Sequence, residues 1–389
     1  MLANKQTYSI EWRVTLIGKL ISVFFVLGIL FSFKLWTSSR LFPLIPLFDV
    51  LHTFPASLDL IYISFLIFLF IANIFYNAIK LRYLIFALLL LLLLQDQMRW
   101  QPWVYVYILM SLPFLIEQTE KETYIILNYL QFILVGIYFW SGVHKLNTNF
   151  IDLIFKNILI DFFRITDTSA IENLRGLGYC IPLLEISIAF ALIIPKMRQI
   201  GVWLACILHL FILFYLSPLG INSNSIVYPW NVGMIIFVLV LFGRSNNKLF
   251  LFKKRNKLSF AALFTLTLIW IFPLFNFFNC WDNSFSFLLY SGKIKNYYIA
   301  VEEKECQKII EKYNPSFILL EGITGGKIID INKWSYRDLN VPFNAERRIF
   351  KKICKDFCAL GIGEPNLVFL EFDGPFKKGR YTKFACSDL

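Results

Sequence analysis

The stretch QFILVGIYFWSGVHKLNTNF, residues 131–150, joins a long apolar run to an abrupt polar end. The run before Gly142 is apolar enough to form a helix that crosses a lipid bilayer. His144 and Lys145 then stand side by side and lead into an asparagine-rich turn. Two interpretations are open at this point. Lys145 either anchors the helix by extending its ammonium group to water, or it is a base placed at the membrane edge.

The composition extends this pattern to most of the chain. Of 389 residues, 58% are hydrophobic and only 16% are charged, and the mean hydropathy is +0.62. About a quarter of the residues of a soluble domain are charged. The apolar residues gather in membrane-length runs before residue 280, and the composition after it is that of a soluble domain. We therefore expect a multi-span membrane domain over residues 1–280 and a soluble tail domain over residues 281–389.

The predicted fold class is an all-α polytopic helical bundle with a small C-terminal α+β domain. Counting runs of roughly 20 apolar residues gives about nine candidate membrane spans. They lie at approximately 15–36, 58–79, 81–95, 102–117, 123–143, 180–195, 199–219, 229–243 and 258–279. Two further segments, 40–56 and 151–179, are interpreted as interfacial or re-entrant pieces that do not span.

The net charge of +12 arises from basic residues that concentrate in alternate connections between the predicted spans. Such residues favour the cytoplasmic side of a membrane. With nine spans, all of these connections share that side. We therefore expect an integral protein, of a bacterial inner membrane, with a cytoplasmic N-terminus and an extracytoplasmic tail. The scattered charge argues against a nucleic-acid partner, and the cluster KKRNK at 253–257 indicates a topology signal or an anionic-lipid contact.

In the predicted tail, alternating and helical patterns indicate strands at 295–301, 317–322, 366–372 and 380–386 and helices at 305–313 and 344–361. Five of the seven cysteines lie in or next to this region. Cys354 and Cys358 are four residues apart and so share one face of a helix. No histidine accompanies them, so no metal site is predicted. An extracytoplasmic tail permits disulfides, but their pairing does not follow from the sequence.

The predicted topology places three polar and aromatic connections on one face of the membrane. They are DQMRWQPW at 96–103, HKLNTNF at 144–150 and NSNSIVYPWN at 222–231. One interpretation is a binding site. The other is a belt of aromatic and snorkelling residues at the membrane interface. The candidate binding residues in and beside these connections are Asp96, Arg99, Trp100, Trp103, Trp140, Trp230 and Asn231.

Ionisable residues inside predicted spans are the strongest functional signal, because burying them in a bilayer is unfavourable. Glu185 and His209 each lie alone in the middle of a span. Either they take part in a reaction or they form structural hydrogen bonds between helices. Lys145 is the best candidate base, because desolvation or a neighbouring cation lowers the pKa of a lysine. The candidate catalytic set is Lys145, His144, His209 and Glu185.

Three segments resemble the HTTM family of membrane proteins, which includes the vitamin K-dependent gamma-carboxylases. They are QDQMRWQPWVYVYIL at 95–109, GIYFWSGVHKLNTNF at 136–150 and HLFILFYLSPLGINSNSIVYPWN at 209–231. The resemblance covers roughly the first 280 residues. It implies reduced vitamin K or another quinol as cofactor, a protein or peptide substrate, and a quinol-linked, lyase-type modification with Lys145 as the base. In that family a histidine occupies the position of Trp103.

Two other functions remain open on the sequence alone. One is a membrane redox partner that passes electrons between a quinone and thiols, which would need reactive cysteines in the tail. The other is a non-catalytic membrane anchor or assembly factor for an exported protein, which would tolerate the loss of Lys145. Membrane lipid is a partner in every case.

Overall fold

A computed structural model describes residues 2–50, 55–116, 120–245, 249, 257–288, 290–315, 317–318, 326–362, 365–373 and 381–389. The described chain is mostly helical and has one five-stranded sheet near its C-terminal end. It divides into two compact units. The first comprises Met1–Gly28, Phe65–Leu88 and Pro102–Gly292, and the second comprises Ile29–Ser64, Leu89–Gln101 and Lys293–Leu389.

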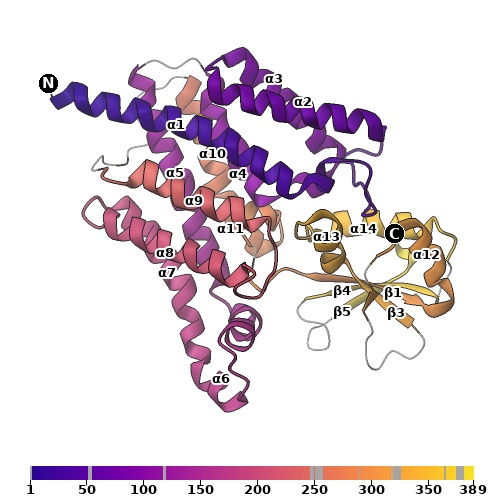
Figure 1. Ribbon diagram of the computed structural model, residues 1–389. Coiled ribbons are helices and arrows are strands. Elements are labelled where there is room, and N and C mark those ends of the chain that lie inside the picture. The colour runs from indigo at the N-terminus through magenta and orange to yellow at the C-terminus, as the bar shows by residue number, and fades with distance from the viewer. Residues whose placement is uncertain are drawn as a thin grey trace. The chain divides into compact units, whose positions relative to one another are not determined.

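Long apolar helices build the first unit, and some of them continue into the second. In it, α5 packs on α7, α7 on α8 and α8 on α9, as Figure 1 shows. The helices are α1 (Leu2–Phe31), α2 (Ala56–Phe75), α3 (Ile79–Gln95), α4 (Pro102–Ser111), α5 (Glu120–Lys145), α6 (Thr168–Leu174), α7 (Cys180–Ile193), α8 (Arg198–Leu216), α9 (Val227–Phe242), α10 (Lys257–Trp270) and α11 (Phe272–Phe275).

The protein is an integral membrane protein, but the predicted count of about nine spans is not confirmed. Six helical stretches of the described chain are long and apolar enough to cross a membrane. They are Ile10–Phe31, Ser57–Phe75, Glu122–Lys145, Thr168–Ile193, Arg198–Leu216 and Phe260–Phe278. The predicted third, fourth and eighth spans correspond to α3, α4 and α9. A helix of about 16 residues is roughly 24 Å long, short of the ~30 Å of a bilayer core. The orientation inferred from an odd count is likewise not confirmed.

The segment between α5 and α6 is helical but wider than an α-helix. Phe150–Phe155 and Ile158–Phe162 form π-helical turns. Phe150, Ile151, Phe155 and Leu159 gather into one buried cluster. This segment therefore buries one apolar side, as the amphipathic pattern of residues 151–179 predicts. The cluster KKRNK lies outside the described side chains, and residues 319–322 of the predicted strand at 317–322 lie outside the described residues.

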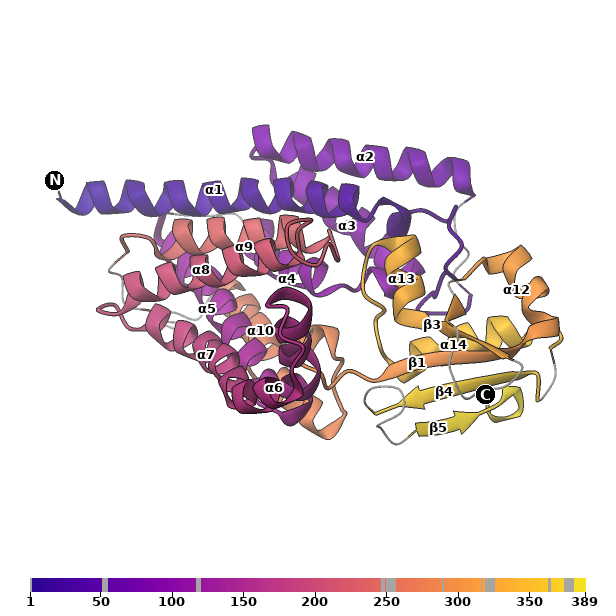
Figure 2. The same cartoon turned by 60° about the horizontal axis from the view of Figure 1, so that its bottom comes forward.

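The sheet of the second unit is antiparallel throughout, in the order β2-β3-β1-β4-β5. Three helices cover it (Figure 2), and they contact one another through Tyr313, Trp334 and Phe357. The strands are β1 (Asn296–Glu302), β2 (Phe317–Ile318), β3 (Gly326–Asp330), β4 (Leu367–Phe372) and β5 (Tyr381–Phe384), and the helices are α12 (Cys306–Tyr313), α13 (Ile331–Leu339) and α14 (Arg347–Cys358).

Alternation along β1 places buried side chains on both faces of the sheet. Tyr297 points toward the helices, and its ring lies 4.5 Å from that of Phe350 in α14. Tyr298 points the other way, because successive side chains of a strand face opposite sides. There it joins a buried cluster with Ile328, Leu370 and Phe372.

A buried charge cluster centred on Asp96 connects two segments of the second unit that lie far apart in the sequence. Asp96 pairs with Arg40 at 2.7 Å, and both side chains are fully buried. Asp96 also accepts hydrogen bonds from the backbone N–H groups of Ile45 and Met98, at 3.2 and 3.0 Å. The nearby Arg99 donates to backbone carbonyls, including that of Leu35 at 3.1 Å. Residues 29–64 and 89–101 are therefore folded against each other by charge and hydrogen bonding.

Asp338 at the end of α13 joins the same segment to the sheet domain. Its carboxylate accepts hydrogen bonds from the backbone N–H groups of Leu41 at 3.0 Å and Phe42 at 2.6 Å. It also pairs with Lys34 at 3.2 Å. The ring of Phe42 packs on Trp334, with centroids 4.7 Å apart. Residues 29–64 thus share a core with the C-terminal strands and helices.

Replacing Asp96 with Ala should strongly destabilise the protein, because Arg40 would keep a buried charge without its partner. The expected loss of stability is about 3–5 kcal/mol. Thermal unfolding of purified protein in detergent measures it. The matched control is Asp49→Ala. Asp49 pairs with Lys352 at 2.7 Å but its side chain is 85% exposed, so this substitution should leave the transition unchanged. Equal effects of the two substitutions would contradict the assignment.

Candidate functional site

One face of α5 carries three polar side chains toward the interior of the first unit. Tyr138, Ser141 and Lys145 follow at spacings of three and four, which places them on one side of a helix. Lys145 is the last residue of α5, where a cation interacts favourably with the helix dipole. The polar face is therefore a local consequence of helical periodicity.

Lys145 forms a buried ion pair with Glu185 of α7. The Nζ atom lies 2.6 Å from Glu185 Oε1, and the side chains are only 11% and 5% exposed. Lys145 Nζ also donates a hydrogen bond to Ser141 Oγ at 2.9 Å. Among the described residues, Glu185 Oε2 has no hydrogen-bond partner although it is buried. The pair therefore retains one carboxylate oxygen that can accept a proton or a hydrogen bond from a further group.

A second chain of hydrogen bonds joins three other helices beside this pair. Tyr138 of α5 bonds to His209 Nε2 of α8 at 2.7 Å, and His209 Nδ1 bonds to Asn231 Oδ1 of α9 at 2.7 Å. Asn231 Nδ2 donates to the carbonyl of Val227, which leaves its Oδ1 to accept from His209. His209 therefore carries its proton on Nδ1, and the Tyr138 hydroxyl donates to Nε2.

The two groups of residues form one polar cluster, which we call the four-helix polar cluster. Its members are Tyr138, Ser141, Lys145, Glu185, His209 and Asn231. Lys145 lies close enough to His209, and Glu185 to Tyr138, for their charges to interact. Because apolar helices surround them, these groups exchange protons and hydrogen bonds mainly with one another or with a bound molecule. The cluster is chemically equipped to donate and accept protons in a dry environment.

His144 lies outside this cluster although it adjoins Lys145 in the sequence. Its ring is stacked between Trp140, with centroids 5.5 Å apart, and Phe277, at 4.8 Å. Successive residues of a helix point about 100° apart, so His144 and Lys145 contact different neighbours. The structure thus places two predicted site residues, His144 and Trp140, in an aromatic stack, where His144 is fully buried.

Asp96, Arg99 and Trp100 belong to the second compact unit, whereas the four-helix polar cluster belongs to the first. All three bind the protein's own backbone. Arg99 donates to the carbonyls of Leu35, Trp36 and Leu92, and Trp100 Nε1 donates to Leu93 at 3.0 Å. These contacts give the three polar side chains a structural role in folding the second unit.

Trp103 and Trp230 belong to the first unit, and both pack on the ring of Tyr107. Their rings lie 6.0 and 5.8 Å from that of Tyr107. Trp103 also packs closely on α1, where a Cβ atom added to Gly28 would lie 2.6 Å from its ring. Gly28 is therefore required to be small so that the indole can lie against the helix.

Tyr138 and Ser141 are members of the four-helix polar cluster that were not predicted from the sequence. The available signal was their spacing from Lys145, seven and four residues earlier on the same helical face. A tyrosine and a serine are ordinary in apolar helices, so only the positions of Glu185 and His209 on other helices give them significance.

Within the described ranges, no three His, Cys, Asp or Glu side chains are grouped so that they could hold a metal ion.

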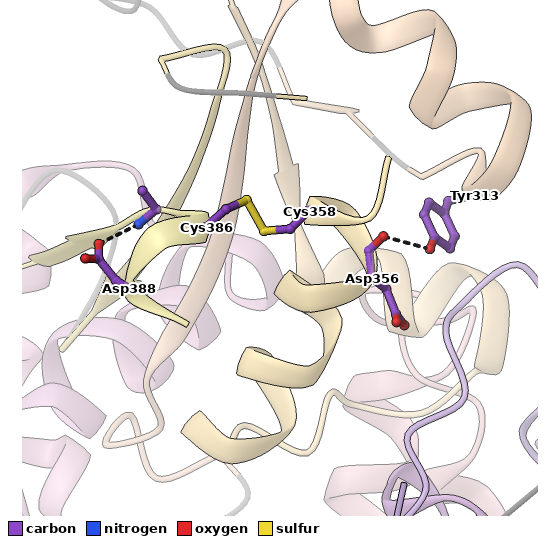
Figure 3. The surroundings of a disulfide bond; sticks show 6 residues. Tyr313, Asp356, Cys358, Cys386 and Asp388 are labelled. Carbon is purple, nitrogen blue, oxygen red and sulfur yellow. Dashed lines mark hydrogen bonds between the residues drawn. A yellow bond between two sulfur atoms is a disulfide. The ribbon is translucent and has the colours of Figure 1, made fainter. Parts of the chain in front are cut away.

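The second unit contains the other chemically reactive group, a disulfide bond between Cys358 and Cys386 (Figure 3). Cys358 ends α14, Cys386 follows β5, and both residues are partly exposed. Cys358 and Cys354 share one face of α14, as their spacing predicts. Cys354 is free and buried, and desolvation raises the pKa of its thiol. Cys180 and Cys280 are also free and are exposed, so Cys358 and Cys386 differ from the other described cysteines in being oxidised.

Comparison with known proteins corrects the predicted resemblance. Residues 123–226 match the family described as methylamine utilisation protein MauE, a membrane protein family. The match covers Tyr138, Lys145, Glu185 and His209 and ends before Asn231. No curated protein matches the chain, and no solved structure matches it. The resemblance to the HTTM family and the carboxylase-like function, with its lyase reaction, are therefore wrong.

A double substitution tests whether Lys145 and Glu185 stabilise the protein as a pair. Lys145→Met alone should destabilise the protein by about 3–5 kcal/mol, because it leaves a buried carboxylate without its cation. Adding Glu185→Gln should recover most of that loss, since no charge then remains buried. Thermal unfolding in detergent measures both variants. If the double variant is no more stable than the single one, the two residues do not form a coupled pair.

Proposed function

We propose that this protein is a membrane redox partner that accepts electrons from the thiols of an exported protein and passes them to a lipid-soluble quinone. The partly exposed Cys358–Cys386 disulfide carries the proposal. It supplies an oxidised pair of sulfur atoms that another protein's thiolate can approach. The buried Cys354 is unsuited to that role, because its thiol is desolvated and stays protonated.

The exchange with the client protein balances without any further reagent. A client thiolate attacks one sulfur of the Cys358–Cys386 bond and forms a mixed disulfide. A second client thiolate then attacks the client sulfur of that mixed disulfide. The client gains a disulfide bond, and Cys358 and Cys386 become thiols. Two electrons and two protons leave the client as the Cys358 and Cys386 thiols form. The disulfide is restored when these thiols give two electrons and two protons to a quinone, which becomes a quinol.

The four-helix polar cluster is proposed for the proton side of that transfer. A bound quinone would supply the two-electron acceptor. Glu185 Oε2 is a buried acceptor without a partner among the described residues, which fits a hydroxyl donor beside it. Lys145 has a third N–H that can donate a hydrogen bond, and the Glu185 carboxylate can hold a proton. The two centres belong to different compact units, and the proposal gives them separate steps.

The match to the MauE family supports a membrane role outside carboxylation. The matched segment, residues 123–226, holds most of the four-helix polar cluster. The Cys358–Cys386 disulfide lies beyond the matched residues. The proposed function therefore combines a membrane segment similar to MauE with thiol chemistry in the C-terminal part of this chain.

The proposal assigns the C-terminal domain to the extracytoplasmic side of a bacterial inner membrane. Disulfides persist in oxidising compartments and are rare in the cytosol. If the N-terminus is cytoplasmic, an odd number of crossings is required, whereas six helical stretches have the full length. At least one of the shorter helices, α3, α4 or α9, would then cross with the membrane thinned around it.

Cys358→Ser and Cys386→Ser should each abolish oxidation of a dithiol peptide by the protein reconstituted in quinone-containing vesicles. Each substitution removes one sulfur atom of the exchanging pair. Cys354→Ser is the matched control and should leave the rate unchanged. Alkylation of free thiols followed by mass spectrometry measures both the peptide and the protein. Lys145→Met should allow one exchange per molecule and slow repeated turnover by about 10²-fold or more.

A measurement on the wild-type protein distinguishes an exchanging disulfide from a purely structural one. Cys358 and Cys386 must become alkylatable when the dithiol peptide is added without quinone. If they stay bonded while the peptide remains reduced, the redox function is overturned. A client whose maturation still requires the protein would then indicate a non-catalytic assembly factor.

Reporter fusions at Leu389 test the proposed orientation. Alkaline phosphatase, which needs disulfides for activity, should be active when fused there, and green fluorescent protein exported in the same way should stay dark. An inactive phosphatase fusion together with a bright fluorescent-protein fusion would place the domain in the cytoplasm. The proposed exchange with an exported client would then be untenable.

A further inference from the structure

A small polar pocket lies in the first unit, away from the four-helix polar cluster in the sequence. Its cavity volume is about 30 Å³. A cavity of about 10–15 Å³ holds one water molecule, so this one admits two water-sized groups. It is lined by Thr15, Lys19, Asn73, Asn77, Arg82 and Phe114. Four of these six side chains can donate hydrogen bonds through nitrogen.

The wall of the pocket is built by close packing around Phe114. A Cβ atom on Gly18 would lie 3.0 Å from the Phe114 ring, so the absence of a side chain lets the ring rest against α1. The guanidinium group of Arg82 lies over the same ring, 5.7 Å from its centroid. Arg82 Nη1 also donates to the Phe114 carbonyl at 3.0 Å. The cation is thereby held in one position.

The amides of the pocket orient Arg82 without neutralising it. Its Nε and Nη2 atoms donate to the side-chain oxygens of Asn73 and Asn77, respectively. Asn73 Nδ2 donates to Ser22 at 2.9 Å. In the part of the chain that the structure describes, neither Arg82 nor the exposed Lys19 pairs with a carboxylate. The pocket therefore has two positive charges that no described carboxylate neutralises, which favours an anion.

One side of the pocket adjoins the end of a candidate membrane span, although Thr15 and Lys19 lie within another candidate span, Ile10–Phe31. Asn77 is in the turn between α2 and α3, immediately beyond the candidate span Ser57–Phe75. Exposed aromatic residues flank the lining residues in the chain, namely Trp12, Tyr76 and Tyr83. Tryptophan and tyrosine are enriched where a helix leaves the hydrocarbon core.

We infer that this pocket binds the phosphate group of an anionic phospholipid. Basic pockets between membrane helices are known sites for anionic headgroups, and a phosphate accepts charge-assisted hydrogen bonds from lysine and arginine. The small volume admits two phosphate oxygens and leaves the glycerol and acyl chains outside, against the exposed apolar surface of the helices. The site is independent of the proposed thiol chemistry.

Lipid titration of the purified full-length protein tests the inference, with native mass spectrometry as the readout. Wild-type protein should bind phosphatidylglycerol at low occupancy and prefer it to phosphatidylcholine. Lys19→Gln should weaken that binding about fivefold. Asn77→Asp should weaken it at least as much, because a carboxylate would then face Arg82. Both positions are exposed, so the variants are expected to fold.

Lys196→Gln is the matched control, because it removes one exposed lysine from the α7–α8 turn, outside the pocket. It should leave the affinity within about twofold of wild type. An equal loss in Lys196→Gln and Lys19→Gln would show unspecific attraction and overturn the site. If millimolar inorganic phosphate competes for the pocket as strongly as the lipid does, the ligand is free phosphate and the assignment to a lipid headgroup is overturned.

Discussion

The buried ion pair between Lys145 and Glu185 illustrates the constraint that shapes this fold, which is that every charge buried among apolar helices needs a partner. A charge that leaves water inside a helical bundle must find an opposite charge or fixed hydrogen bonds within the protein. Lys145 finds Glu185 on α7, and His209 finds Tyr138 on α5 and Asn231 on α9. These contacts determine which faces of α5, α7, α8 and α9 meet. Apolar packing alone would allow the helices to rotate about their axes.

The same constraint shapes the second unit with different chemistry. There Asp96, Arg40 and Arg99 are buried together, and the unshared donors of Arg99 are taken up by backbone carbonyls. Asp338 performs the corresponding task for the backbone of residues 41 and 42. In both units the ionised groups hold together segments that the chain places far apart. Buried carboxylate oxygens without a hydrogen bond among the described residues occur in both units, at Glu185 Oε2 in the first and at Asp96 Oδ2 in the second, where Arg40 forms an ion pair with it.

The sequence was sufficient to predict the helical class, the small sheet domain and the apolar helix at 123–143, because these follow from hydrophobic periodicity. It was insufficient for the number of spans. Hydropathy marks apolar runs, but a run of 16 residues reads the same whether its helix crosses a bilayer or packs inside a protein. The six full-length stretches are set apart by their length in the folded chain, where α6 and α7 join into one stretch across Gly178.

The candidate site was partly predictable for a related reason. Glu185, His209 and Lys145 are conspicuous as ionisable groups among apolar residues, whereas Tyr138 and Ser141 acquire meaning only from neighbours on other helices. Asp96 and Arg99 were equally conspicuous, yet Asp96 pairs with Arg40 from a distant segment and Arg99 donates to backbone carbonyls, and no residue pattern reveals either contact. The mistaken family arose from short aromatic motifs around Lys145. Such motifs occur wherever helices end at a membrane surface, so they carry little information about descent.

The composition of the second unit changes how deletions of the C-terminal domain must be interpreted. Residues 29–64 and 89–101 share that unit with residues 293–389, and Phe42 and Lys34 depend on Trp334 and Asp338 for their contacts. A chain truncated after Gly292 would therefore lose the partners of two upstream stretches as well as the deleted residues. An inactive truncation would reflect misfolding of what remains, and single substitutions are the sounder way to dissect this protein.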